Sequence, residues 1–236
     1  MEASVGARAE SARRPGRPGA DTPALPEEES ILQRGLEAFA ELGYDRASAR
    51  ELARRLGVSH NFINDRYGSK AAFWRAVVDS ALGAQMARMP EPDPSLDDEE
   101  NLRRLVTAFY RTAADTPLVG RLFVDELHQD TERLTYLYDN YIGVVVGNMA
   151  SSVDRLVAAG RMAPVPMDVL FFAVVPTVSG MLDVPLARRL GRSGASSPER
   201  IAATAESLAS LVLDGVLGTG GKASHSAGAG TRGSTS

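Results

Sequence analysis

Residues 48–70 of the chain read SARELARRLGVSHNFINDRYGSK, and this stretch decides the fold. Ser48 is a good helix N-cap, and Glu51 follows at the spacing of a capping box. Gly57 permits a sharp turn after this first helix, and a second short helix is predicted over residues 60–67. Two helices joined by so tight a turn are typical of a helix-turn-helix, which lays its second helix in the major groove of DNA.

The second helix, with Ser59 as its predicted cap, has Ile63 as its one strong core residue. Its outer face is therefore predicted to be used elsewhere, and Asn and Arg are side chains that pair with base edges and reach phosphates. Contacts to base edges are predicted for Arg50, Asn61 and Phe62, with Phe62 exposed and packed on a thymine methyl group. Contacts to the DNA backbone are predicted for the following residues: Ser48, Ser59, His60, Asn64, Tyr67 and Lys70.

The segments on either side extend the motif into a larger helical unit. A helix is predicted over residues 26–42, ended by Gly43. Its buried stripe is predicted from the helical period as Leu32, Leu36 and Phe39, with Ile31 only at the margin. After the motif, Ser69 caps a further helix that is predicted to reach about residue 87.

These features together resemble a known family. The residues that carry the resemblance are Phe39, Gly43-Tyr44, Ser48, Glu51-Leu52-Ala53, Leu56-Gly57-Val58-Ser59, Ile63 and Tyr67-Gly68-Ser69-Lys70. Over residues 28–75 the chain looks like the DNA-binding domain of the TetR family of bacterial transcriptional regulators. The resemblance implies a homodimer that binds a palindromic operator, more often as a repressor than as an activator. Asn64 stands where the family usually has Tyr, whose hydroxyl contacts a phosphate.

Residues 89–97, MPEPDPSLD, form a Pro-rich acidic linker that no continuous helix can cross. Residues 98–218 then read as helices only, because no run alternates with a period of two. Asp97 and Glu100 have the spacing of another capping box. The predicted helical segments are residues 98–115, a segment beginning at Pro117, residues 131–159, residues 167–190 with Pro176 and Pro185 as interruptions, and residues 198–217.

The segments 167–190 and 198–217 are more apolar than one buried stripe requires, so burial on a second side is predicted. A homodimer interface through residues 167–217 would supply it, and the family resemblance implies the same. The resemblance also implies a pocket for an unidentified small-molecule effector, for which plain core packing is the alternative at each position. The predicted pocket residues are Phe109, Tyr110, Phe123, Tyr136, Met149, Phe171, Phe172 and Thr177.

Charge is distributed unevenly along the chain, whose formal net charge is −4. Residues 46–70 hold six basic and two acidic residues, so the basic surplus lies on the predicted DNA face. Residues 1–26 are predicted to be a disordered basic arm. Within it, the run RRPGRP at residues 13–18 resembles a segment that enters a narrow minor groove, with a plain flexible tail as the alternative.

The sequence argues against several other classes of protein. It has no Cys, which excludes disulfides and thiolate metal sites, and no apolar run long enough to span a bilayer. No phosphate-binding loop or nucleophile elbow is apparent, so no catalytic residue and no cofactor is predicted. His128, among Asp125, Glu126 and Asp130, is interpreted as part of a solvated helix face rather than a metal site.

The sequence therefore predicts an all-α protein with a three-helix helix-turn-helix domain and a C-terminal helical domain for effector binding and dimerisation. The predicted boundaries are an arm at 1–26, a DNA-binding domain at 27–88, an effector and dimerisation domain at 98–218 and a disordered tail at 219–236. The expected partners are double-stranded DNA, a second copy of the chain and a small molecule, with no membrane, in the cytoplasm and on the nucleoid. The alternative is a small-molecule-binding protein of the same fold that has lost DNA reading.

Overall fold

A computed structural model describes residues 27–180, 185–192 and 197–218, so the predicted arm and tail lie outside it. The described chain is helical, as predicted, and its one pairing of extended backbone is an isolated bridge between Met162 and Leu217. The elements in chain order are α1 Glu28–Leu42, α2 Ala49–Leu56, α3 Phe62–Tyr67, α4 Lys70–Met86, α5 Asp98–Asp115, α6 Pro117–Leu127, α7 Glu132–Leu137, η1 Tyr138–Ile142, α8 Gly143–Ala158, α9 Met167–Val174, η2 Pro176–Gly180, α10 Pro185–Arg189 and α11 Pro198–Val216.

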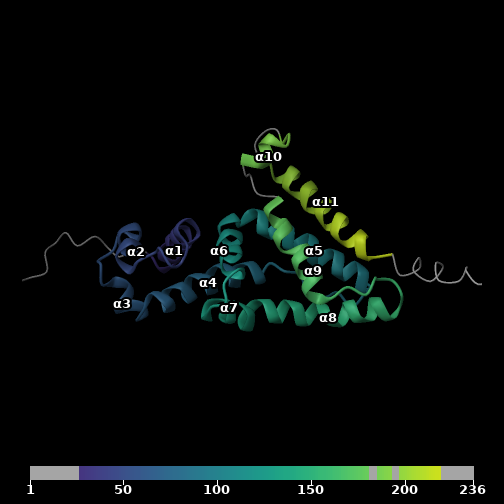
Figure 1. Ribbon diagram of the computed structural model, residues 1–236, viewed down its shortest axis with the longest axis horizontal. Helices are drawn as coiled ribbons and strands as arrows, with labels where there is room; N and C mark the ends of the chain where they lie inside the picture. Colours follow the sequence, from purple (N-terminus) through teal and green to yellow (C-terminus); the bar gives the residue numbers. More distant parts are fainter. Residues whose placement is uncertain (1–26, 181–184, 193–196, 219–236) are drawn as a thin grey trace, which may run out of the picture.

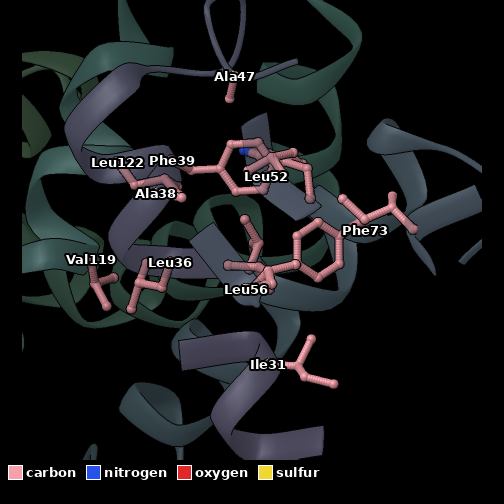
Figure 2. Close-up of a cluster of buried hydrophobic side chains, with 14 of the residues drawn as sticks. Ile31, Leu36, Ala38, Phe39, Ala47, Leu52, Leu56, Phe73, Val119 and Leu122 are labelled. Carbon is pink, nitrogen blue, oxygen red and sulfur yellow. The ribbon is translucent and has the colours of Figure 1, made fainter. Parts of the chain in front are cut away.

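Helices α1–α3 gather at one end of an elongated molecule, and α4 runs from them towards the remaining helices (Figure 1). We call α1–α3 the head and α5–α11 the body. The two are not separate in their packing, because α1 also contacts α6. Figure 2 shows this shared core, in which Val119 and Leu122 of α6 lie beside Leu36 and Ala38 of α1.

The buried side of α1 is turned slightly from the predicted one. Ile31 is 2% exposed and belongs to the core, whereas Leu32 is only partly buried against it. Gly35 has no side chain, which allows Phe73 and Val77 of α4 to pack directly over its backbone. The helix therefore centres its contact on the side of Ile31 and Gly35 rather than on that of Leu32.

Local capping determines where several helices begin. The Ser48 side chain accepts the Glu51 backbone N–H at the start of α2, and that of Ser69 accepts the Ala72 N–H at the start of α4. Asp97 and Glu100 form a reciprocal capping box at the start of α5. The three N-caps agree with the sequence predictions, because a cap depends only on residues within one helical turn. The capping box predicted for Ser48 and Glu51 does not close, because the Glu51 carboxylate accepts from Arg54 and Arg55 instead.

The long helix predicted over residues 131–159 is interrupted by a π-helical turn. Helix α7 passes through η1 into α8 without a break in the chain's helical path. Gly143 ends the π turn, and a Cβ placed there would lie 3.0 Å from the carbonyl oxygen of Tyr138. A residue without a side chain therefore suits this position.

The body is held together mainly by α5 and α11. Helix α11 buries a stripe of small and apolar residues at four-residue spacing, namely Ala205, Ala209 and Leu213, which belongs to the same cluster as Val106 and Tyr110 of α5. Alanine at two of these positions allows the helix backbones to approach closely, which explains why α5 and α11 form the most extensive helix pair of the described chain.

Candidate nucleic-acid interface

The outer face of α2 and α3 presents a set of exposed polar side chains. Of the residues predicted to contact DNA, six are exposed: Ser48, Arg50, Ser59, His60, Asn61 and Asn64. Ser48, Arg50 and His60 border one shallow hollow of about 430 Å³, together with Glu51 and Arg54. The structure thus brings residues from the start of α2 and the turn before α3 to one surface.

Arg50 differs from the other cations of this surface. Within residues 46–70, all of which are described, it is the one basic side chain without an intramolecular hydrogen bond or ion pair. Its guanidinium group is therefore available to a partner. A free guanidinium matches the paired acceptors on the major-groove edge of guanine.

The remaining cations of the surface are held by nearby acids or carbonyl groups. Arg54 donates two hydrogen bonds to Glu51, and Arg55 donates to both Glu51 and Glu41. The hydrogen bonds from Arg54 and then from Arg55 lower the pKa of the Glu51 carboxyl to about 2. The basic surplus seen in the sequence is thus largely paired within the folded head.

Helix α3 is shorter than predicted, and its start is different. It begins at Phe62, with Asn61 in the N-cap position and no side-chain capping bond. The Ser59 side chain was predicted to cap this helix. Instead, the backbone carbonyl of Ser59 accepts a hydrogen bond from the Phe62 N–H at 3.0 Å. The prediction was wrong because the turn closes through the backbone and leaves the Ser59 side chain exposed.

The prediction that Phe62 is exposed and contacts a base is also wrong. Its side chain is only 7% exposed and belongs to the core of the head. It packs edge-on against Tyr67 with the ring centroids 6.3 Å apart, a separation usual for aromatic pairs. In so short a helix, Ile63 alone would bury too little apolar area to hold α3 in place. Phe62 therefore supplies core contact, and the outward face is left to the polar residues.

Two predicted backbone-contact residues make hydrogen bonds to other groups of the protein. The Tyr67 hydroxyl donates to Glu28 of α1 at 2.7 Å. Lys70 was expected to point towards the DNA backbone, but its Nζ donates to the carbonyl of Tyr44 at 3.0 Å and lies 4.0 Å from the centre of that ring. Burial lowers the pKa of Lys70, which agrees with its inward position.

The eight residues predicted to line an effector pocket are divided between two cores. Tyr110, fully buried, donates to the carbonyl of Val174 and bonds the Thr177 hydroxyl at 2.7 Å. The other members separate as follows: Phe109 and Met149 pack with Tyr110 on the body's cluster, Phe123, Tyr136 and Phe171 pack on the cluster shared with the head, and Phe172 is 55% exposed. The eight residues do not share one hydrophobic cluster, and their part in an effector pocket stays a prediction.

A junction between head and body was not foreseen from the sequence. Glu126 of α6 and Arg133 of α7 form an ion pair at 2.8 Å, with side chains 5% and 15% exposed. The Arg133 guanidinium lies over the Tyr44 ring at 3.9 Å, beside Lys70. The ion pair of Glu126 and Arg133 could not be predicted from the sequence, because it forms only when α6 and α7 pack against each other.

A second set of contacts at the junction joins α4 to α7 and to the π-helical turn η1. One oxygen of Asp79 on α4 accepts hydrogen bonds from Tyr136 at 2.6 Å and from Tyr141 at 2.7 Å. Residues five apart on an α-helix point about 140° away from each other, and a π turn brings them closer to one side. Burial and the bond to Asp79 raise the pKa of Tyr136 to about 12. The π turn therefore allows both hydroxyls to hold α4.

The described residues form neither a candidate metal site nor a membrane-spanning helix. Among the described residues, no group of three or more potential ligands could hold a metal ion. Glu126, which lies two residues before His128, forms an ion pair with Arg133. No helix in the described part of the chain is long and apolar enough to cross a membrane.

Comparison with known proteins agrees with this geometry. Residues 31–77 match the family model described as bacterial regulatory proteins, tetR family. No curated protein matches the chain by sequence.

Solved structures share the fold over most of the chain. The TetR family transcriptional regulator PfmR from Thermus thermophilus is 22% identical, with 78% of this chain and 93% of that chain covered and a TM-score of 0.58. The ketosteroid transcriptional regulator KstR2 of Mycobacterium tuberculosis is 17% identical, with 79% of this chain and 93% of that chain covered and a TM-score of 0.60. The transcriptional regulator FadR from Bacillus subtilis, solved in complex with stearoyl-CoA, is 15% identical, with 80% of this chain and 99% of that chain covered and a TM-score of 0.59.

The helix-turn-helix head and the helical body have the fold and the DNA-binding domain of a bacterial transcriptional regulator. More narrowly, residues 31–77 form a domain of the TetR family of bacterial regulators, which the residues of the head had suggested.

Proposed function

We propose that the protein is a ligand-responsive repressor that binds a palindromic operator as a homodimer, in the cytoplasm. The observation that carries the proposal is the outward face of the head, where Arg50 is unpaired and borders the same hollow as Ser48 and His60. A short reading helix contacts few base pairs. Two heads on one dimer would read two half-sites together, which makes the sequence they recognise long enough to be specific.

The apolar surface of the body supports the dimer. Five exposed apolar side chains lie within the segment predicted for dimerisation, on α9, on or just after α10, and on α11: Val169, Phe172, Leu186, Leu190 and Leu211, between 52% and 79% exposed. On α9 the residues Val169 and Phe172 are three apart and share one face. A second copy of the chain would bury these side chains and so offset their exposure to water.

Replacing Leu211 by Glu is expected to shift the protein from dimer to monomer. Leu211 is 74% exposed, so the substitution costs little in the folded monomer, whereas a carboxylate buried in the interface would lack a partner. Sedimentation equilibrium at micromolar concentration measures the change. Val144, 55% exposed on α8 outside the predicted interface, provides the control Val144→Glu, which should stay dimeric. A wild-type protein that is monomeric under these conditions would contradict the proposed dimer.

Replacing Arg50 by Ala is expected to relax specificity at one base pair of each half-site. A bidentate arginine–guanine contact contributes about 1–3 kcal/mol of discrimination against the wrong base. The measurement is binding to the operator and to its single-base variants. Arg75, exposed on α4 and stacked on Tyr136 away from the head's outer face, provides the control Arg75→Ala. Equal losses on operator and random DNA would assign Arg50 to the backbone instead.

Effector response would act through the junction between head and body. Asp79 and Trp74 of α4 contact Tyr136, and Arg133 contacts Tyr44, so a movement of α7 and η1 changes the position of both α4 and the head. A ligand that favours a different arrangement of α7 would thereby change the separation of the two heads. KstR2 is described as a ketosteroid regulator, and FadR was solved with stearoyl-CoA, which makes large apolar molecules reasonable first effectors to test.

Selection of binding sites from random DNA by the purified full chain tests the proposal. Enrichment of a palindrome supports an operator-binding dimer. If the protein is folded but enriches no sequence, the result supports the alternative function, a helical small-molecule-binding protein that does not read DNA. The observation that favours this alternative is Asn64, which stands in place of the family's usual Tyr.

A further inference from the structure

The carboxylate of Glu51 lies between two cations on the surface that would meet DNA. Arg54 Nε donates to Glu51 Oε2 at 2.9 Å, and its terminal nitrogen donates to Oε1 at 2.6 Å. Arg55 Nε donates to the same Oε1 at 3.0 Å. Arg54 is the more exposed of the two arginines, with 70% of its side chain accessible against 26% for Arg55. Glu51 therefore holds the more exposed of these two arginines along the helix.

A second carboxylate does the same for α3. Glu28, at the start of α1, forms an ion pair with Arg66 and accepts a hydrogen bond from the Tyr67 hydroxyl at 2.7 Å. The Arg66 and Glu28 side chains are 49% and 44% exposed, so the pair lies at the surface. The two groups of α3 best suited to a phosphate are thus both bound to one acidic residue of another helix.

Pairing of this kind weakens non-specific attraction to DNA. Binding without sequence preference depends on cations that neutralise phosphates and release counterions, with about 0.9 unit of salt dependence for each contact. An arginine that is already paired gains less from a phosphate, because it must leave its carboxylate, and that carboxylate then repels the phosphate. Arg50 has no such partner and remains free for a base edge.

We propose that Glu51 and Glu28 are specificity-determining residues, which suppress binding to random DNA by holding Arg54, Arg66 and Tyr67 in intramolecular contacts. The proposal rests on the proposed DNA-binding function. It explains how a head with a basic surplus would avoid non-specific sites, which compete in great excess with any operator. Operator binding would depend on Arg50 and the exposed polar side chains, and the carboxylates would weaken only the electrostatic part.

The test measures the affinity of the full chain for random duplex DNA and for the selected operator at several salt concentrations. Glu51→Gln is expected to raise the affinity for random DNA several-fold and to steepen its salt dependence by about one unit per bound head. The affinity for the operator should rise less, so the ratio of specific to non-specific binding falls. Glu28→Gln should act in the same direction.

Two control variants separate this effect from a general change in charge. Glu37→Gln on α1 removes the same charge, and Glu37 accepts only from Gln33 rather than from a cation. It should leave the salt dependence unchanged. The double variant Glu51→Gln with Arg54→Gln should return to the wild-type slope, because the freed arginine is the cause of the increase. Circular dichroism checks that each variant remains folded.

The possible failures are distinguishable. If the wild-type protein binds DNA but Glu51→Gln and Glu37→Gln change its salt dependence equally, the role of Glu51 is refuted while the regulator stands. A double variant that keeps the steeper slope would also refute it, because Arg54 would then not be the released group. If the folded wild-type protein binds no duplex at any salt concentration, the proposed function itself fails and this inference fails with it.

Discussion

Gly35→Ala is expected to destabilise the protein by about 1–3 kcal/mol, which is the usual cost of overpacking a well-packed core. A Cβ at this position would lie 2.7 Å from Phe73 Cζ and 2.7 Å from Val77 Cγ2. Neither side chain has room to move, since Phe73 is 0% and Val77 1% exposed. The substitution would therefore push α1 away from α4, the helix that carries the head.

Urea unfolding followed by circular dichroism measures this effect. Gly83→Ala on α4 is the matched control, because its added Cβ meets nothing within 4 Å and the helix is otherwise undisturbed. Alanine is the better helix former, so the control should be stabilised by about 0.4–1 kcal/mol. If both variants gained stability, α1 and α4 would not be in close contact at Gly35.

Glu126→Ala is expected to cost about 3–5 kcal/mol, because it leaves the Arg133 charge buried without its partner. Arg133 is 15% exposed, and both of its bonds to Glu126 come from the same nitrogen, at 2.9 and 2.8 Å. The loss would also release Arg133 from its place over Tyr44. We therefore expect the junction of head and body to loosen along with the fall in stability.

Thermal or urea unfolding of the variant, compared with an exposed pair, tests the size of this effect. Glu206→Ala breaks the pair with Arg111, whose side chains are 60% and 50% exposed, and should cost no more than about 1 kcal/mol. Replacing Glu126 and Arg133 together by Leu and Met should recover much of the stability, because no unpaired charge remains. Equal costs at the exposed and buried sites would contradict the burial of Glu126.

Much of the fold was predictable because its signals are local. Ser48, Ser69 and Asp97 cap helices within a single turn, and Gly57 adopts the left-handed conformation that ends α2, with φ of 71°. Helical periodicity and the prolines at 117 and 198 likewise placed the helices of the body. Each of these depends on residues close together in the chain, so no knowledge of the packing was needed.

The candidate site was predicted less completely, because its side chains depend on other helices. The sequence showed six cations between residues 46 and 70, but not that Glu28 and Glu41 of α1 would hold two of them. It also could not show that Phe62 turns inward, since a helix of six residues has no periodicity from which to read its buried side.

The sequence by itself determined that the chain is helical, that residues 48–70 form a helix-turn-helix, and that this head resembles those of the TetR family. Only the tertiary structure decided which of its charged groups remain free. Arg50 is unpaired, while Arg55, Arg66 and Lys70 are bound to groups of other segments. The reason is physical: capping and periodicity act over one turn of helix, whereas the pairing of a charge depends on which side chains of distant segments the packing brings within a few ångströms.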